Sequence, residues 1–285
     1  MATADQTIAQ DSFSAFHNAN YTALSADDAF ERFAVGEIAL RREKLGGSEI
    51  ENGLVGSASD GGIDALFIFL NRQELVEADS VRLSRRKNAL AGLQAGLRID
   101  VMVVHAKNET KWDTNVFPKI ESSLKAILDP YATAATLRAF PLNNAVVEKA
   151  LILKKLREKL SSLVPVMVFN IQYVTFAPES NVDTYMKTKQ TQLQDWLLSK
   201  LPSGSSATVK YVGDSSIVTQ LRVSHDFQAK LVFTKAPVRD DSALVGLVKT
   251  KDYIKFLREE RSNVLREQLF AVNVRDYAGV GRPRS

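Results

Sequence analysis

The spacing of hydrophobic residues along the chain alternates between the pattern of a buried strand and the period of a helix, and this alternation predicts strands that alternate with helices. Two uninterrupted apolar runs, ALFIFL at 65–70 and RIDVMVVHA at 98–106, are typical of buried strands. The run VPVMVFNIQYVTF at 164–176 has the same character. Further strands are expected at about 207–213, 228–234 and 243–249.

Helical spacing of apolar residues separates these runs. The first helix is expected from about Ala26, with Ser25 as its N-cap and two aspartates in its first turn, where the helix dipole favours negative charge. The other expected helices cover about 116–128, 145–163 and 182–201, with a long one from about 252. The pattern as a whole predicts an α/β chain.

Domain boundaries follow from composition. Residues 1–24 are polar, so we expect a flexible N-terminus over 1–19. The APES segment at 177–180 interrupts the pattern and predicts a soft boundary. The chain is therefore expected to hold one α/β domain at 20–180 and a second α/β region at 181–285.

Composition narrows the function classes. The 285 residues are 45% hydrophobic and 25% charged, which is typical of a globular protein in water. The chain has no cysteine, which excludes disulfides, thiolate metal sites and cysteine nucleophiles. No apolar segment approaches the roughly 20 residues of a membrane helix, and the N-terminus has no signal-peptide pattern, so we expect a cytoplasmic protein with no membrane span. The pI of about 9.1 favours polyanionic partners.

The stretch DGGID at 60–64 is the first candidate for chemistry. It is either a plain turn that enters a strand or a pair of carboxylates, Asp60 and Asp64, held where a metal ion can reach them. Strands adjacent in sequence usually pair, and pairing of the first two apolar runs would bring Asp64 near His105 and Lys107. A lysine at the end of a buried strand needs water or an anion near its ammonium group.

These groups are the ones that phosphodiester hydrolysis requires. Carboxylates hold a divalent cation, which polarises the phosphate and lowers the pKa of a bound water, and a lysine stabilises the developing charge. On the first helix, Glu37 falls in the middle of an apolar stripe, where it marks a functional cluster or pairs with a buried base. Glu31 falls at the edge of that stripe and is typical of an ordinary surface position.

Two further segments are candidates for nucleic-acid contacts. Lys111 and Trp112 offer a cation for phosphate and a ring for base stacking, although the pattern is more typical of a tryptophan that packs over its own loop. The basic run LSRRKNAL contributes Arg85, Arg86 and Lys87, which meet phosphate or form a solvated loop. Neither a GxxxxGK nor a GxSxG motif occurs, so the sequence does not indicate an NTPase or an esterase.

DGGID with its strand, followed by VMVVHAK, resembles the split PD-(D/E)xK motif of the restriction-endonuclease-like superfamily. More narrowly, the chain resembles the abortive infection phage resistance (AIPR) family. The first helix, AFERFAVGEIALRR, and the segment LFAVNVRDYAGV at 269–280 support this resemblance. That segment resembles the Asn-x-Arg-x-aromatic-x-Gly pattern of the family through Asn273, Arg275, Tyr277 and Gly279. Members usually continue further, so we expect a short version or a fragment.

The resemblance implies a restriction-endonuclease-like mixed sheet flanked by helices. It implies that Asp64 is a metal ligand, that Lys107 is the catalytic lysine and that the helix-borne acid is Glu37. His105 stands where a glutamate or glutamine is usual; its imidazole can ligate a metal, and this softer ligand favours Mn²⁺ over Mg²⁺ or weakens the site. Asp60 is a further candidate ligand.

The implied function is a metal-dependent endonuclease that cleaves DNA or RNA in anti-phage defence, with Mg²⁺ or Mn²⁺ as cofactor. The alternative is a nuclease fold that has lost catalysis through the change at His105 and binds nucleic acid or a protein partner. A homodimer is compatible with either interpretation. Sequence specificity is not indicated by any residue.

Overall fold

The computed structural model describes residues 2–41, 43, 45–85, 89–222, 231, 233–235, 237–240 and 243–257. The chain forms two compact units, Met1–Val223 and Ser224–Ser285. Each unit is described by itself.

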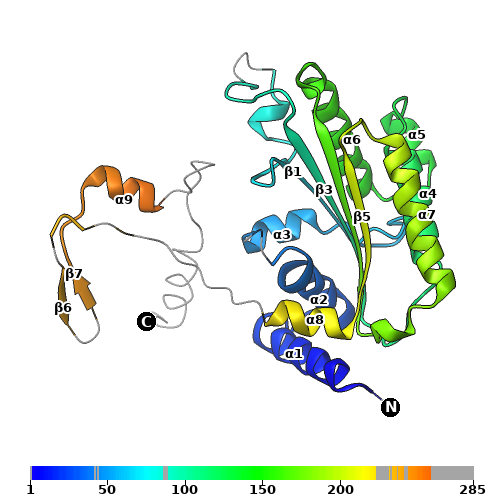
Figure 1. Ribbon diagram of the computed structural model, residues 1–285, viewed down its shortest axis with the longest axis horizontal. Helices are drawn as coiled ribbons and strands as arrows, with labels where there is room; N and C mark the ends of the chain where they lie inside the picture. Colours follow the sequence, from blue (N-terminus) through cyan, green and yellow to red (C-terminus); the bar gives the residue numbers. More distant parts are fainter. Residues whose placement is uncertain are drawn as a thin grey trace, which may run out of the picture. The chain divides into compact units, whose positions relative to one another are not determined.

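A five-stranded mixed sheet forms the centre of the first unit, in the order β2-β1-β3-β4-β5. Strand β1 (Ala65–Leu70) is antiparallel to β3 (Arg98–Lys107) and to the short β2 (Glu74–Leu75). Strands β3, β4 (Val166–Thr175) and β5 (Ser206–Val212) run parallel. The predicted α/β class is therefore confirmed, with one antiparallel strand beside three parallel ones (Figure 1).

The pairing of β1 with β3 is the one that adjacency predicts. Ala65 lies opposite Val104, and the Asp64 N–H donates to the Val104 carbonyl at 3.0 Å. This register brings the residue before β1 to the carboxyl end of β3. The sheet therefore places Asp64 beside the last residues of β3.

Helices cover both faces of the sheet (Figure 1). Alternate residues of β3 point to opposite faces. Val101 and Val103 join a core with helices α4, α6 and α7, whereas Met102 and Val104 join a second core with α1, α2, η1 and α8. The first set of helices comprises α4 (Val116–Ile127), α6 (Asn144–Leu160) and α7 (Thr184–Lys200). The second comprises α1 (Ala4–Asn20), α2 (Ala26–Phe33), the π-helix η1 (Ala34–Ala39) and α8 (Asp214–Leu221).

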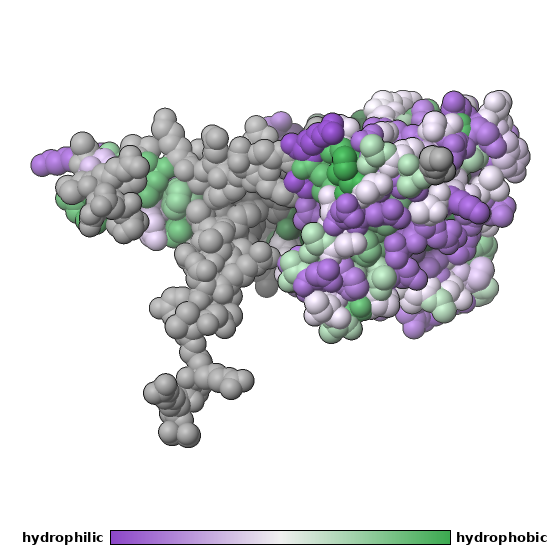
Figure 2. All heavy atoms as spheres, turned by 90° about the horizontal axis from the view of Figure 1, so that it is seen from below, coloured by the Kyte–Doolittle hydropathy of each residue, from purple (hydrophilic) through white to green (hydrophobic). Residues whose placement is uncertain are grey.

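Short elements complete the first unit. They are α3 (Gly47–Gly53), α5 (Ala134–Ala139) and three 3-10 turns, η2 (Val81–Leu83), η3 (Ser161–Leu163) and η4 (Glu179–Asn181). Helix α2 begins as predicted, because the Ser25 hydroxyl accepts a hydrogen bond from the Asp28 N–H at 3.1 Å. On the face shown in Figure 2, hydrophilic residues cover most of the surface and hydrophobic ones form smaller patches between them.

The expectation of a flexible N-terminus is wrong, because these residues form α1. Thr3 caps this helix by accepting from the Gln6 N–H at 2.9 Å, and its hydroxyl donates to Asp214 of α8 at 2.6 Å. Phe13 is 7% exposed and packs edge-on against Phe30 of α2. Contacts with distant parts of the chain, rather than local sequence, therefore order this segment.

The expected boundary at 177–180 is also wrong, because β5, further along the chain, belongs to the same sheet and α7 packs into the core of the first unit. The APES segment instead forms η4, which is tied to the start of α8. The Glu179 carboxylate accepts hydrogen bonds from the Gly213 N–H at 2.9 Å, the Ser215 hydroxyl at 2.9 Å and the Ser216 N–H at 3.2 Å. A capping carboxylate thus makes this turn part of the first unit.

The described part of the second unit contains an antiparallel hairpin and one helix. The hairpin joins β6 (Val238–Asp240) and β7 (Ala243–Val245), and α9 spans Thr250–Leu257. Most of the expected strand at 228–234, and the AIPR-like segment at 269–280, lie outside the described residues. None of the helices in the described part of the chain is long and apolar enough to cross a bilayer.

Candidate functional site

Asp64 and His105 meet at the carboxyl end of β3, as the predicted strand pairing requires. Both are buried, at 5% and 7% exposure. One carboxylate oxygen of Asp64, Oδ2, accepts a hydrogen bond from the Ala106 N–H at 2.6 Å, and His105 Nδ1 lies 2.8 Å from the same oxygen. A buried carboxylate and a buried imidazole therefore face each other across two strands.

The imidazole of His105 is not satisfied by its surroundings. Despite the short distance to Asp64, the geometry is not that of a hydrogen bond, and neither ring nitrogen has a hydrogen-bond partner among the described residues. The ring lies against Tyr173, with centroids 5.1 Å apart. A buried polar atom left without a partner costs about 1–3 kcal/mol, so His105 keeps donor or acceptor capacity for something further.

Glu31 of α2 is a helix-borne acid that interacts with the charge of Asp64. Burial, followed by the negative charge of Asp64, raises the pKa of Glu31 to about 8. The carboxylate lies against Gly56, where an added Cβ would come within 2.9 Å of Glu31 Oε2. The surface position expected for Glu31 is wrong, because the loop that carries Gly56 covers it.

Glu37, the acid selected by the sequence, lies elsewhere. Its carboxylate pairs with Arg41 at 2.7 Å, and the guanidinium of Arg41 also donates to the Leu221 carbonyl at 3.3 Å, at the end of α8. The projection that placed Glu37 in mid-stripe assumed a regular α-helix. From Ala34 the helix has π geometry, which turns less per residue and rotates Glu37 away from the expected direction. Glu37 is therefore engaged by Arg41, and its expected role as a metal ligand stays a prediction that this geometry does not favour.

Lys107 ends β3 on the same face as His105, and its ammonium finds an anion, as expected. Its Nζ lies 3.1 Å from Asp113 Oδ2 and 3.8 Å from Glu109. The pKa of Asp113 is lowered, first by the hydrogen bond from the Asn115 N–H and then by Lys107. The lysine is thus held at the edge of the site by a carboxylate that stays ionised.

Asp60 forms a turn. Its Oδ1 accepts from the Gly62 N–H at 2.6 Å and lies 3.4 Å from Lys119 Nζ. Gly61 and Gly62 have φ of 70° and 81°, and a Cβ on Gly61 would come within 2.2 Å of Ser123 Oγ. The turn interpretation of DGGID is therefore confirmed for Asp60, whereas metal binding by Asp64 stays a prediction.

Of the candidate nucleic-acid contacts, Lys111 and Trp112 lie beside the site, because they precede Asp113 and because Trp112 packs on Tyr173, the ring next to His105. Trp112 packs edge-on against Tyr173 and Tyr211, at 5.2 and 5.0 Å between centroids, and its N–H donates to the Pro178 carbonyl at 2.9 Å. The packing interpretation of Trp112 is therefore confirmed. Lys111 beside it is exposed.

Arg85 is exposed and precedes the amino end of β3. The strand alone separates that end from His105 by about 23 Å, at roughly 3.3 Å per residue. Arg86 and Lys87 lie outside the described residues. Arg85, the described member of the run, lies toward the opposite end of the sheet, because its neighbour Ser84 accepts a hydrogen bond from Lys159 near the end of α6.

A metal would find two ready ligands at this site. Among the described residues, no three histidine or acidic side chains lie close enough together to hold an ion as they stand. The 2.8 Å between Asp64 Oδ2 and His105 Nδ1 nevertheless approaches the roughly 3 Å between adjacent ligands of an octahedral ion with bonds of about 2.1 Å. One carboxylate with one imidazole is a softer donor set than Mg²⁺ prefers, so it suits Mn²⁺ better, with waters in the remaining ligand positions.

Fold and site together define a mixed α/β protein with a buried aspartate–histidine pair at a strand end, beside a lysine and a partly buried glutamate. Comparisons with protein-family models, curated proteins and solved structures give no match. The AIPR resemblance therefore stays a prediction.

Proposed function

We propose that the first unit is a restriction-endonuclease-like domain that hydrolyses nucleic-acid phosphodiester bonds with a divalent metal ion. The observation that carries the proposal is the approach of Asp64 Oδ2 to His105 Nδ1, two ligand atoms that the sequence separates by 41 positions. The mixed sheet with helices on both faces is compatible with this fold. A role in abortive infection rests on the resemblance alone.

Each residue has a role that its surroundings support. Asp64 and His105 would hold the ion, which when bound supplies polarisation of the phosphate and a more acidic water. Glu31, which interacts with the charge of Asp64, is an acid for a further ligand position. Its pKa of about 8 means that it is largely protonated at neutral pH, so it limits the repulsion of Asp64 until a cation is present.

Lys107 would stabilise the charge that develops on the phosphate. Asp113 fixes the lysine side chain at the strand end, and a substrate phosphate would compete with Asp113 for the ammonium group. The same ion pair favours the alternative function, a catalytically silent module that binds nucleic acid or a protein, because it already neutralises Lys107. The absence of a third close ligand among the described residues favours the alternative in the same way.

Cleavage assays distinguish the two functions. Plasmid DNA, single-stranded DNA and RNA are incubated with Mg²⁺ or Mn²⁺ and with the native chain, Asp64→Ala, Lys107→Ala or the control Glu37→Gln. The nuclease requires metal-dependent cleavage that the first two substitutions abolish and the control retains. If no form cleaves any substrate while nucleic acid still binds equally to the native chain and to Asp64→Ala, the silent module is correct.

A further inference from the structure

A second site lies at the other end of the parallel strands. A cavity of about 380 Å³ opens between the end of α4, the last turns of α6, the start of β4 and the loop after α7. This volume falls in the range of small-molecule sites. Met167 on β4 lies six residues before Tyr173, so the strand separates the cavity from the Asp64–His105 pair by about 20 Å.

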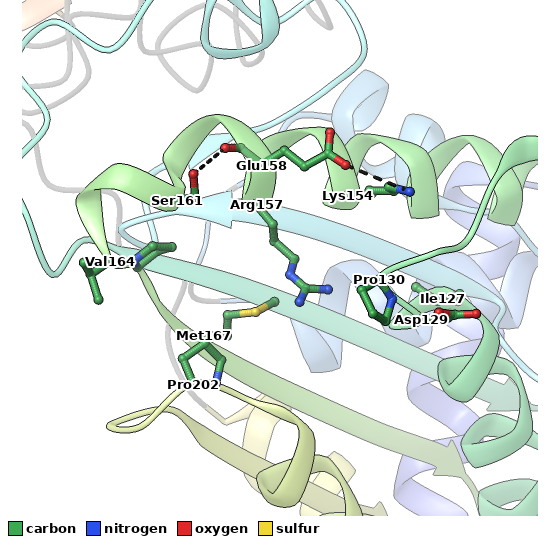
Figure 3. A pocket seen from close by; sticks show the side chains of 11 residues that line it. Ile127, Asp129, Pro130, Lys154, Arg157, Glu158, Ser161, Val164, Met167 and Pro202 are labelled. Carbon is green, nitrogen blue, oxygen red and sulfur yellow. Dashed lines mark hydrogen bonds and ion pairs between the residues drawn. The ribbon is translucent and has the colours of Figure 1, made fainter.

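The walls of the cavity are largely apolar. The apolar part of its lining consists of Ile127, Pro130, Val164, Pro165, Met167 and Pro202. Figure 3 shows Pro130 and Met167 beside a space that the Arg157 side chain enters from α6. An apolar pocket with one well-placed polar group is the usual form of a small-molecule site.

Arg157 is the cation of this cavity, and its charge is not paired. Figure 3 shows its guanidinium extending between Met167 and Pro130. Among the described residues no hydrogen bond or ion pair reaches this guanidinium, and burial lowers the pKa of Arg157. The neighbouring Glu158 carboxylate points along the helix toward Lys154, 3.9 Å away. A partly desolvated guanidinium without an anion is costly unless a ligand supplies one.

The other charged groups of the lining are already engaged. Lys154 Nζ donates to the Ala132 carbonyl at 2.5 Å, and Asp129 Oδ1 accepts from the Tyr131 N–H at 2.9 Å. Val164 at the rim is 71% exposed and has φ of 47°, a left-handed conformation that is strained for a β-branched residue. Such strain is often retained at ligand sites. Arg157 alone therefore remains to recognise a ligand.

We infer that this cavity binds a small molecule with an apolar body and a single carboxylate, which pairs with the Arg157 guanidinium. The planar fork of an arginine matches a carboxylate through two parallel hydrogen bonds. A phosphate dianion fits less well, because Asp129 and Glu158 lie at the same cavity and only one unpaired cation faces it. The volume equals that of about a dozen waters at roughly 30 Å³ each, which suits a ligand of about ten non-hydrogen atoms.

Octanoate is a probe of this size and chemistry, and octan-1-ol is its control without the charge. The full chain is labelled at its methionine methyl groups with ¹³C and titrated with either compound while the methyl resonances are recorded. The Met167 methyl lines the cavity, whereas the Met186 methyl on α7 is buried outside it and serves as an internal control. The Met167 resonance is assigned with Met167→Leu.

Octanoate is expected to shift the Met167 resonance saturably, to leave Met186 unchanged and to bind at least about 10-fold more tightly than octanol. Arg157→Gln should weaken octanoate about 10-fold or more and leave octanol within twofold. Arg138→Gln, which removes an exposed arginine outside the cavity, should leave octanoate within twofold. The inference is overturned if octanoate binds no more tightly than octanol, or if Arg157→Gln and Arg138→Gln lower the affinity for octanoate equally. It is also overturned if octyl phosphate binds the native chain more tightly than octanoate does. The metal site is intact in all these variants, so the outcome is independent of the proposed nuclease.

Discussion

Two buried aspartates lie at opposite ends of the same pair of strands, and their surroundings differ. Asp100 on β3 is 9% exposed and is surrounded by donors. The Arg72 N–H donates to it at 3.1 Å and the Arg98 Nε at 2.5 Å, and the Arg98 guanidinium adds an ion pair. Its negative charge is therefore compensated within the protein.

Asp64 is as deeply buried but lacks such compensation. One backbone N–H, that of Ala106, donates to it, while an unsatisfied His105 ring and a second acid, Glu31, lie nearby. An acid whose charge is compensated by donors within the protein has a structural role in the fold. An acid kept in a costly position without a cation indicates a site, because burial and like-charge neighbours are what functional residues commonly show.

The largest expected difference between these two acids is in catalysis. Asp64→Asn should lower metal-dependent cleavage about 10³-fold, since loss of a metal ligand removes several kcal/mol of transition-state stabilisation. Asp100→Asn should leave cleavage within a few-fold of the native rate and instead lower stability by about 2 kcal/mol, because two arginines lose their anion. Cleavage rates and urea unfolding measure the two effects. Equal losses of activity in both variants would contradict the distinction.

A divalent cation should stabilise the protein through Asp64 and not through Asp100. At 100 times its dissociation constant, an ion that binds only the folded state adds about 2.7 kcal/mol, which corresponds to roughly 5–10 °C in Tm for a unit of this size. Mn²⁺ should do this for the native chain and for Asp100→Asn, and not for Asp64→Asn. Thermal unfolding with Mn²⁺ or with EDTA measures the shift. A shift that survives Asp64→Asn would place the ion elsewhere.

The pH dependence of stability compares Glu31 with Glu37. Between pH 4.5 and about 8 the folded chain keeps a proton on Glu31 that the unfolded chain has lost. The free energy of unfolding therefore falls as pH rises through this window and levels off above about 8. Glu31→Gln should remove this component, so its Tm in EDTA should exceed the native Tm by a few degrees at pH 8 and by less at pH 5.

Glu37→Gln is the matched control for this experiment. It removes the same charge from the same helical segment and loses the partly exposed pair with Arg41, which is worth about 0.3–0.5 kcal/mol. Its Tm should therefore run parallel to the native curve from pH 5 to pH 8. If the two variants show the same pH dependence, Glu31 is not the titrating acid of the site.

The choice between Glu31 and Glu37 also shows which features of the site can be predicted from the sequence. Strand pairing and the approach of Asp64 to His105 follow from apolar runs and adjacency, which are local properties. Glu31 could not be selected, because the start of the π-helix at Ala34 and the covering loop at Gly56 leave no periodic signal. Helix α1 was missed for a related reason, since its partner α8 lies about 200 residues away.

The cavity near Arg157 was missed for a different reason. Its walls come from four separate segments, and none carries a motif. The one signal in the sequence was a valine followed by a proline after a helix. That pair does not predict the left-handed backbone conformation of Val164. Sites built from distant apolar residues around one cation therefore need the structure.

The smallest expected effect concerns Asp60, the acid of the same motif that forms the turn. Asp60→Asn keeps an oxygen that can accept from the Gly62 N–H and loses only the contact with Lys119, whose side chain is 59% exposed. Stability should stay within about 0.5 kcal/mol, whereas Asp60→Ala should lose about 1 kcal/mol with the hydrogen bond. Cleavage should change less than twofold in both. A loss of cleavage in Asp60→Asn as large as in Asp64→Asn would make Asp60 a metal ligand, because the amide preserves the turn and changes only the charge.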